Sequence, residues 1–547
     1  MHSSGAKYSG TGISNGKISG KIRFWHSDTE KTAERKKKSI QEELAQFEKA
    51  QKTAVAETRA LEKKALLTIG QEEAQIFEIH RMMLEDEDYV SSVMEKIKDG
   101  KSADTAIRLT RDKFCKVFGE LGDEYLSARV ADVKDISAQL IKNLSGDVSI
   151  KKEKDNEPYI LVASDLTPSE TVGLDSEKIL GFVTFGGTPS SHTAILARAM
   201  GIPAVVGTGK IDSSYDGELG LLNAEKGTFI ISPSKEELTE FEREQREYNK
   251  IASEHEKYLR SVMNKPAVTR SGHKVMIYAN IGSEQEITSA LSNGSEGIGL
   301  LRSEFLYLSK TSYPTEEELF EVYRDIAIKM QGKRVIVRTL DIGADKQIPY
   351  FKLPREENPA LGYRAIRICL DRRELFKTQL RAILRASDYG RVSIMLPMIV
   401  SPAEVTESRA ILEECKQELL TRGQGFDSKI ELGIMIETPA AAIMSEELSE
   451  LVDFFSVGTN DLTQYTLAAD RQNPYLTGVC DKNSEPVLRL IKMATEAIHQ
   501  RGGWIGVCGE MAADLSLTQR FVDMKIDELS VSTPYLLGVR GKVSECK

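Results

Sequence analysis

The chain has 547 residues, too many for one hydrophobic core, which suggests about three or four domains. Its hydrophobic content of 40% and charged content of 29% are ordinary for a soluble globular protein. The formal net charge is -10, from 83 acidic and 73 basic residues, which argues against a broad nucleic-acid surface and favours a basic protein partner.

Hydropathy and cysteine usage argue against a membrane or secreted protein. No apolar run approaches the roughly 20 residues that cross a bilayer, and the N-terminus, Met1-His-Ser-Ser-Gly5, lacks the apolar core of a signal peptide. The cysteines form no CxxC pair, so we expect free thiols in a reducing cytoplasm and neither a disulfide framework nor a zinc site. They are Cys115, Cys369, Cys415, Cys480, Cys508 and Cys546.

The first part of the chain changes composition abruptly. Residues 1–28 are rich in Gly and Ser and weakly β-like, whereas residues 29–146 contain almost no Pro and many Glu, Lys, Ala and Leu. Apolar side chains in the second segment recur at roughly helical intervals, which predicts a bundle of antiparallel helices. Examples are Leu44, Phe47, Val55, Leu61 and Leu66.

Strand-like apolar runs return after residue 147. They cover residues 159–163, 179–183, 204–206 and 228–231, and a helix is expected to begin near His192. We interpret residues 1–28 and 147–233 as one α/β domain into which the helical segment is inserted.

A charged segment, residues 234–265, follows and opens with the capping-box sequence Ser234-Lys-Glu-Glu237. Such a polar helix suits a rigid connector between two domains. The alternative is a helix that packs wholly on one of them.

The remaining residues, 266–547, repeat a strand followed by a helix. This is the pattern of a (β/α)₈ TIM barrel, with a doubly wound open sheet as the alternative fold. The predicted strands cover residues 275–281, 297–302, 335–342, 392–398, 431–437, 453–458, 504–510 and 528–532.

Polar side chains gather at the ends of these predicted strands, where barrels of this kind carry their active sites. Arginine binds phosphate and carboxylate through paired N–H groups, and Mg²⁺ takes one or two carboxylates together with substrate oxygens. Each residue alone could form a salt bridge at the barrel rim, but together they suit a small, highly charged phosphate ester, with Glu437 and Asp461 holding Mg²⁺. The residues are Arg302, Arg338, Asp341, Glu437, Asn460, Asp461, Arg471 and Cys508.

A second candidate site is the segment 184–198, TFGGTPSSHTAILAR, in which a Gly-rich turn leads into a helix. His192 falls in the first turn, where the positive end of the helix disfavours imidazolium and binds phosphate. A neutral imidazole there is a nucleophile. The alternative is a surface histidine beside a helix cap.

The motifs resemble those of enzyme I of the bacterial phosphoenolpyruvate-dependent sugar phosphotransferase system, over nearly the whole chain. The segment 453–465 reproduces a long family signature without a gap. The segments are 166–171 (LTPSET), 297–305 (GIGLLRSEF), 338–346 (RTLDIGADK), 357–364 (ENPALGYR), 437–439 (ETP) and 453–465 (DFFSVGTNDLTQY).

The resemblance implies a phosphotransferase that phosphorylates its own His192, with Thr171 as hydrogen-bond partner. It implies that Mg²⁺ binds Glu437 and Asp461, and that Cys508 gives a proton to the enolate to form pyruvate. The residues expected to bind phosphoenolpyruvate are Arg302, Arg338, Asn460, Arg471 and Arg364.

It also implies that the helical insertion docks the small phosphocarrier protein HPr and that the barrel forms a homodimer. Apolar residues beside acids in the segment 80–87 suit a basic partner, although they could equally belong to an ordinary amphipathic helix. Because the histidine and the phosphoenolpyruvate site belong to different predicted domains, a hinge is expected near the connector helix.

One departure from the family concerns the turn before the histidine. Gly187-Thr-Pro-Ser-Ser-His192 stands where the commoner pattern is Gly-Gly-Arg-Thr-Ser-His, so an arginine that could stabilise the phosphohistidine is missing. A phosphoenolpyruvate synthase or pyruvate phosphate dikinase would need a nucleotide-binding domain that nothing here resembles. A non-catalytic regulatory paralogue that docks a carrier protein is the remaining alternative.

Overall fold

The computed structural model describes residues 5–25, 38–68, 71–120, 124–145, 157–164, 166–173, 178–187, 191–308, 310–343, 348–354, 356–470, 476, 479 and 483–547. The chain divides into two compact units, Met1–Ser253 and Glu254–Lys547. Among the described residues, no helix is both long and apolar enough to cross a membrane.

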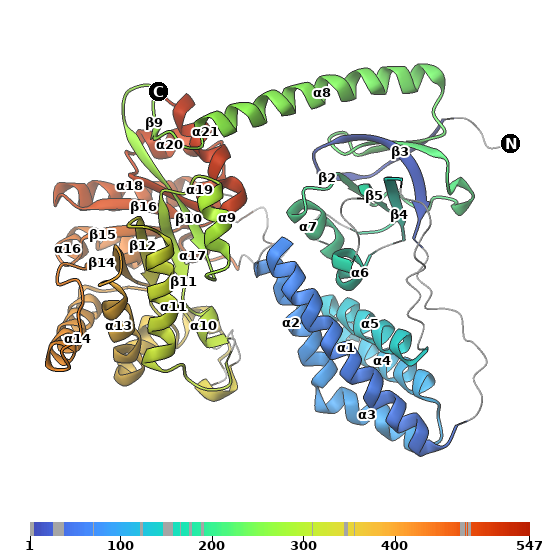
Figure 1. Ribbon diagram of the computed structural model, residues 1–547, viewed down its shortest axis with the longest axis horizontal. Helices are drawn as coiled ribbons and strands as arrows, with labels where there is room; N and C mark the ends of the chain where they lie inside the picture. The colour runs from blue at the N-terminus through green and yellow to red at the C-terminus, as the bar shows by residue number, and fades with distance from the viewer. Residues whose placement is uncertain are drawn as a thin grey trace. The chain divides into compact units, whose positions relative to one another are not determined.

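Five helices of the first unit lie side by side as a bundle, as the helical periodicity predicted (Figure 1). Apolar side chains from all five helices form its core, including Phe47, Leu84, Val93, Ile107 and Ile136. Asp86 caps α3, because its carboxylate accepts the N–H of Tyr89 at 2.8 Å. The helices are α1 (Ile40–Thr68), α2 (Gln71–Glu85), α3 (Glu87–Lys98), α4 (Ala103–Glu120) and α5 (Glu124–Ser145).

A mixed sheet forms the rest of the first unit, in the order β1-β8-β7-β3-β4-β5-β6-β2. Strands β3 to β6 run parallel, and β3 pairs with β4 through Ile22 and Ile160, so the helical bundle is inserted between two neighbouring strands. The short helices α6 (Pro168–Gly173) and α7 (His192–Ala199) follow β4 and β5. The strands are β1 (Ala6–Ser9), β2 (Thr11–Ser14), β3 (Lys17–Phe24), β4 (Tyr159–Ala163), β5 (Ile179–Thr184), β6 (Ala204–Val206), β7 (Leu219–Asn223) and β8 (Thr228–Ile231).

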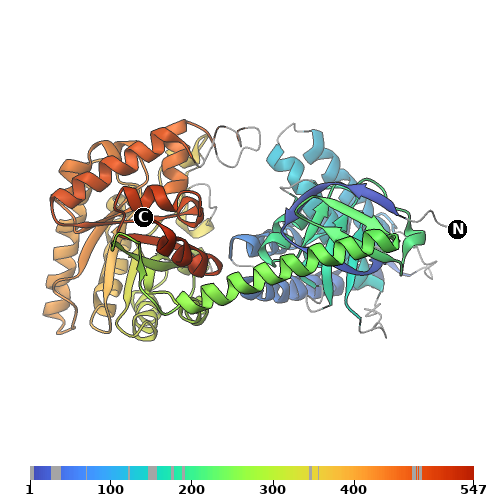
Figure 2. The same ribbon diagram turned by 90° about the horizontal axis from the view of Figure 1, so that it is seen from above.

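Helix α8 (Lys235–Val262) continues from one unit into the other and is unbroken in Figure 2. The predicted capping box is present, since Ser234 Oγ accepts the N–H of Glu237 at 3.2 Å and the Glu237 carboxylate accepts the N–H of Ser234 at 3.0 Å. Within the first unit Glu244 pairs with Lys17 at 2.9 Å, and within the second the Tyr258 hydroxyl donates to the Gly541 carbonyl at 3.4 Å.

The described part of the second unit contains a closed barrel of eight parallel strands, because β10 pairs with β11 on one side and with β17 on the other. The predicted TIM barrel is therefore confirmed, and the alternative of an open sheet is wrong. The strands are β10 (Lys274–Ile281), β11 (Gly297–Arg302), β12 (Arg334–Arg338), β13 (Val392–Leu396), β14 (Glu431–Ile436), β15 (Phe454–Gly458), β16 (Trp504–Cys508) and β17 (Glu528–Ser532), and β9 (Ala267–Val268) pairs with β10 from outside.

Several predicted strands extended too far. The strands predicted to end at residues 342, 398 and 510 end at Arg338, Leu396 and Cys508, because the residues that follow leave the sheet and form the loops at the rim. Met398 and Gly509 have positive φ of 57° and 94°, which is incompatible with a continuing strand.

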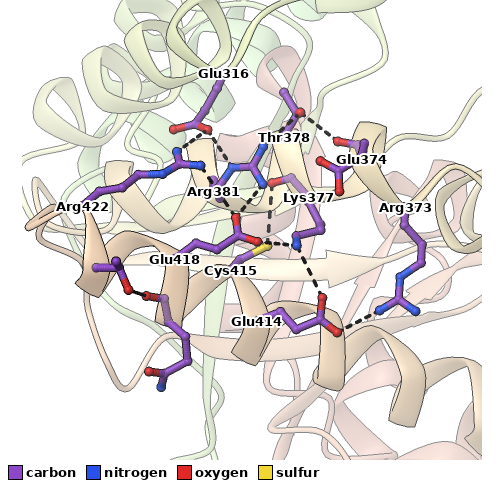
Figure 3. A network of polar contacts seen from close by, with 12 residues as sticks. Glu316, Arg373, Glu374, Lys377, Thr378, Arg381, Glu414, Cys415, Glu418 and Arg422 are labelled. Carbon is purple, nitrogen blue, oxygen red and sulfur yellow. Dashed lines mark hydrogen bonds and ion pairs between the residues drawn. The ribbon is translucent and has the colours of Figure 1, made fainter.

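Helices surround the barrel, and charged side chains join three of them, α11, α13 and α14 (Figure 3). Arg381 binds Glu316 at 2.7 Å and Glu418 at 2.9 Å, Lys377 pairs with Glu418, and Arg422 reaches Glu316 at 3.3 Å. The helices are α9 (Glu286–Ser292), α10 (Phe305–Leu308), α11 (Glu316–Lys329), α12 (Ile366–Asp371), α13 (Arg373–Ala386), α14 (Pro402–Thr421), α15 (Pro439–Ile443), α16 (Ser445–Ser449), α17 (Thr459–Leu467), α18 (Glu485–Gln500), α19 (Glu510–Ala513), α20 (Thr518–Asp523) and α21 (Leu536–Glu545).

Candidate active site

The predicted site residues of the barrel lie at the carboxyl ends of its strands. Arg302 and Arg338 end β11 and β12 and are direct neighbours in the strand register. Glu437 follows β14 at once, and Asn460 and Asp461 lie in the first turn of α17, directly after β15. Cys508 ends β16. Arg471 lies outside the described residues.

Arg338 is buried and is held by acids on both sides. Its guanidinium donates to Glu304 Oε1 at 2.6 Å and lies 2.9 Å from Asp341 Oδ2. Burial alone would lower the pKa of Arg338, but these carboxylates, with Glu437 and Asp461, raise it well above its usual value. The arginine is therefore permanently charged and fixed in orientation.

Asp341 also connects Arg338 to Arg364. The Asp341 Oδ1 atom accepts from Arg364 Nη2 at 3.0 Å, and all three side chains are less than a tenth exposed. Arg364 Nη1 reaches the Tyr465 hydroxyl at 3.5 Å, and that hydroxyl donates to the Ala360 carbonyl at 2.5 Å. Both arginines thus reach the rim in a fixed arrangement.

Glu437 is 1% exposed and accepts the backbone N–H of Met398 at 2.5 Å. Gly458 makes room for it, since a Cβ there would lie 2.8 Å from Glu437 Oε2. Burial, and then the nearby Asp461 and Asp341 carboxylates, raise the pKa of Glu437 to about 8, against the opposing charge of Arg338.

This crowding of acids bears on whether a metal ion fits. Carboxylates whose mutual repulsion raises a pKa are stabilised by a cation between them. Mg²⁺ binds through one or two carboxylates and leaves its other positions to water and substrate oxygens. Glu437 and Asp461 fit that requirement in number and chemistry.

Cys508 is 2% exposed and accepts a hydrogen bond from Ser456 Oγ at 3.5 Å, while its thiol donates to the Val457 carbonyl at 3.3 Å. Burial raises the pKa of Cys508 to about 12, reinforced by the acids Glu528 and Glu437 and opposed by Ser456 and Arg338. The sulfur therefore carries its proton at neutral pH and can donate it.

Asn460 is fixed by the neighbouring loop. Its Oδ1 atom accepts the N–H of Glu510 at 3.2 Å. Gly509, which precedes Glu510, has φ of +94°, and a Cβ on it would lie 2.4 Å from Thr459 Oγ1. This position therefore requires glycine. The close approach of the two loops keeps the Asn460 amide at the rim beside Asp461.

In the first unit, α7 begins at His192 as predicted, and Ser191 Oγ accepts the N–H of Ala194 at 3.4 Å. Helix α6 has its own capping box, in which Thr167 and Glu170 exchange hydrogen bonds of 3.0 and 3.3 Å. Thr171 lies on α6, which packs against α7. The side chains of Thr171 and His192, and residues 188–190, lie outside the described set, so the hydrogen bond between these two residues stays a prediction.

Sequence reasoning missed two residues of the barrel site. Glu304 lies two positions after Arg302 and could have been found as an acid placed to neutralise a buried arginine. Tyr465 follows Asp461 by four positions on α17, so helical spacing puts both on one face.

Chemically, this rim combines fixed arginines, an acidic pair in which Glu437 is buried and Asp461 is partly exposed, an amide and a protonated thiol. Arginines bind phosphate and carboxylate groups together. The acidic pair suits a divalent cation, which binds phosphate oxygens in turn. The arrangement therefore fits a small phosphorylated acid, with the Cys508 thiol as an available proton donor.

Comparison with known families agrees with this reading. Models of phosphoenolpyruvate-utilising enzymes match the chain in three parts: the N-terminal domain at residues 9–129, the mobile domain at 155–227 and the phosphoenolpyruvate-binding domain at 256–547. Curated relatives named phosphoenolpyruvate-protein phosphotransferase include one from Haemophilus influenzae, 42% identical over 495 residues, which are 90% of this chain and 85% of the relative. Another, from Bacillus subtilis, is 41% identical over 517 residues, covering 94% of this chain and 90% of the relative.

Proposed function

Because this chain belongs to the family of phosphoenolpyruvate-protein phosphotransferases, we propose that it transfers the phosphoryl group of phosphoenolpyruvate to its own His192 and releases pyruvate. The observation that carries the proposal is the barrel rim, where Arg338 is fixed between Glu304 and Asp341 beside the acidic pair Glu437 and Asp461.

Phosphoenolpyruvate offers two anionic groups, a phosphate and a carboxylate, to the arginines of the rim. Arg302 and Arg338 are adjacent in the strand register and can bind one group between them. Arg364, Asn460 and Arg471 complete the proposed binding set. The immobilised guanidinium of Arg338 requires little reorganisation when charge develops, and this favours the transition state.

Glu437 and Asp461 would hold Mg²⁺, which, when bound, neutralises charge on the phosphate and on the leaving enolate oxygen. In the transfer, a nitrogen of the neutral His192 ring attacks phosphorus, the N–P bond forms and the P–O bond to the enolate breaks. The enolate then takes a proton at carbon from the Cys508 thiol, which gives pyruvate and a thiolate that solvent reprotonates. Arg338 and the carboxylates around it absorb the charge changes.

The phosphohistidine would next pass its phosphoryl group to a histidine of the small phosphocarrier protein HPr, docked on the helical bundle. Support comes from α2 and the start of α3, where Met82 is 55% exposed beside the exposed acids Glu85, Asp86 and Glu87. Two residues of the 80–87 segment, His80 and Leu84, are buried and so are not exposed as predicted. A cytoplasmic homodimer, formed through the barrel, remains part of the proposal.

Intact-protein mass spectrometry after mixing with phosphoenolpyruvate and Mg²⁺ tests this function. The wild type should gain one acid-labile phosphate and release pyruvate, and His192→Ala should gain none. His255→Ala is the matched control, because His255 is an exposed histidine on α8. No adduct on the wild type would favour the non-catalytic paralogue, and an adduct on His192→Ala would mean that another residue is the acceptor.

A further inference from the structure

A histidine inside the helical bundle is held between two acids that the proposed chemistry does not use. His80 on α2 is fully buried, and its Nε2 atom lies 3.1 Å from Asp132 Oδ1. Its Nδ1 atom lies 3.6 Å from Asp135 Oδ2, an ion-pair distance. Both acids come from α5 and are less than a twentieth exposed. Burying three polar groups together is costly, so their position calls for an explanation.

Asp135 connects this cluster to α6 in the α/β part of the unit. Its Oδ2 atom accepts the backbone N–H of Ser169 at 3.2 Å, so the oxygen facing His80 also faces the first turn of α6. That N–H has no partner within a short helix. Carboxylates are strong acceptors at helix amino termini, and the contact fixes α6 against the bundle.

A further hydrogen bond continues from this segment to the helix that begins at His192. The Thr193 hydroxyl is 1% exposed and donates to the carbonyl of Leu166 at 2.9 Å, just before α6. Helix α6 carries Thr171, the expected partner of His192. These contacts therefore lead from His80 through Asp135 and α6 to the residue that follows His192.

We propose that Asp135, which lies against His80, is a positioning residue for phosphoryl transfer, because it sets where α6 stands relative to the start of α7. This inference rests on the proposed function. In-line transfer needs the attacking nitrogen within a narrow range of positions, and displacement by about 1 Å can slow a reaction by roughly a hundredfold. The site for phosphoenolpyruvate lies in the other unit and does not depend on Asp135.

The test compares three variants of the full chain. Asp135→Ala removes the acceptor of the Ser169 N–H, whereas Asp135→Asn keeps an oxygen acceptor at the same place. Tyr89→Phe is the matched control, since it deletes a buried 2.7 Å hydrogen bond to Ser137 on the same helix α5 without touching α6. Pyruvate release in a single turnover gives the limiting rate and the phosphoenolpyruvate concentration for half that rate.

Asp135→Ala should lower the limiting rate by roughly tenfold or more, with an unchanged half-saturating concentration and faster amide hydrogen exchange in α6. Asp135→Asn should recover most of the rate, and Tyr89→Phe should keep it despite a similar loss of thermal stability. If Asp135→Ala does not fold, His80→Gln should show the same selective loss of rate. A wild-type rate in Asp135→Ala, or an equal loss in Tyr89→Phe, would overturn the inference. A wild type that forms no phosphoenzyme would overturn the proposed function itself.

Discussion

The substitution Glu528→Gln should make the barrel more stable, increasingly so as the pH rises. Glu528 is the first residue of β17, at the amino-terminal end of that strand, and is 1% exposed. Two glycines make room for its carboxyl group, because a Cβ at Gly506 or Gly299 would lie 1.7 or 2.3 Å from its oxygens. Burial raises the pKa of Glu528 from 4.5 to about 8, against the opposing effects of Arg334 and Ser530.

The size of the effect follows from proton linkage. An acid with a raised folded-state pKa retains a proton that the unfolded chain has released, so its contribution to stability falls as pH rises from 4.5 to about 8 and is constant above that. At about 1.4 kcal/mol per pH unit, the penalty is roughly 2 kcal/mol at pH 6 and 4–5 kcal/mol at pH 9. Glutamine has nearly the same shape and no charge, and it therefore avoids this penalty.

Differential scanning calorimetry of the barrel transition at pH 6 and pH 9 measures the difference. The advantage of Glu528→Gln in unfolding temperature should grow by about 5–10 °C between the two pH values. Glu496→Gln makes the same atomic change on the exposed face of α18 and should give no such trend. An advantage of equal size at both pH values, or a variant less stable than wild type at pH 9, would refute the reasoning.

Three further experiments test the rim. Arg338→Ala should abolish phosphorylation and destabilise the barrel by about 3–5 kcal/mol, measured by calorimetry, because buried Glu304 loses the arginine that it pairs with and buried Asp341 loses one of its two arginines. Glu437→Gln should raise the Mg²⁺ concentration needed for phosphorylation by roughly tenfold or more, as seen in a metal titration, since it removes one of two proposed ligands. The Cys508 thiol should resist iodoacetamide at pH 8, as followed by mass spectrometry, because burial raises its pKa to about 12 and leaves little thiolate; rapid alkylation would contradict that burial.

The barrel and the rim that carries the candidate site could be predicted from sequence because both depend on local pattern. Each strand is a short apolar run followed by a helix, and parallel strands bring their carboxyl ends to one rim. Arg302, Arg338 and Glu437 were therefore expected together, although the runs are far apart in the chain. The ends of the strands were less predictable, because apolar residues such as Ile342 and Met398 continue past the last ladder hydrogen bonds.

The contacts that hold the rim were harder to predict, because they depend on side-chain reach between loops. A buried arginine needs an acid, but several acids follow the strands, and the sequence does not say which of them reaches it. Glu304 and Asp341 flank Arg338 from two different loops. The link from His80 to α6 joins segments separated along the chain by three further helices, and no local periodicity relates them.

Each unit thus contains a buried cluster of charged and polar side chains, around Arg338 in one and around His80 in the other. Desolvation makes such clusters poor sources of stability compared with apolar packing of the same volume. Their advantage is geometric, because a buried and paired charge has one orientation, whereas an exposed one has many. More carboxylates surround Arg338 than its single positive charge can neutralise. Together with burial, this excess of negative charge raises the pKa of Glu437. This excess of negative charge is unfavourable in the protein alone. It would, however, bind a divalent cation, and the cation would in turn bind the phosphate of the substrate.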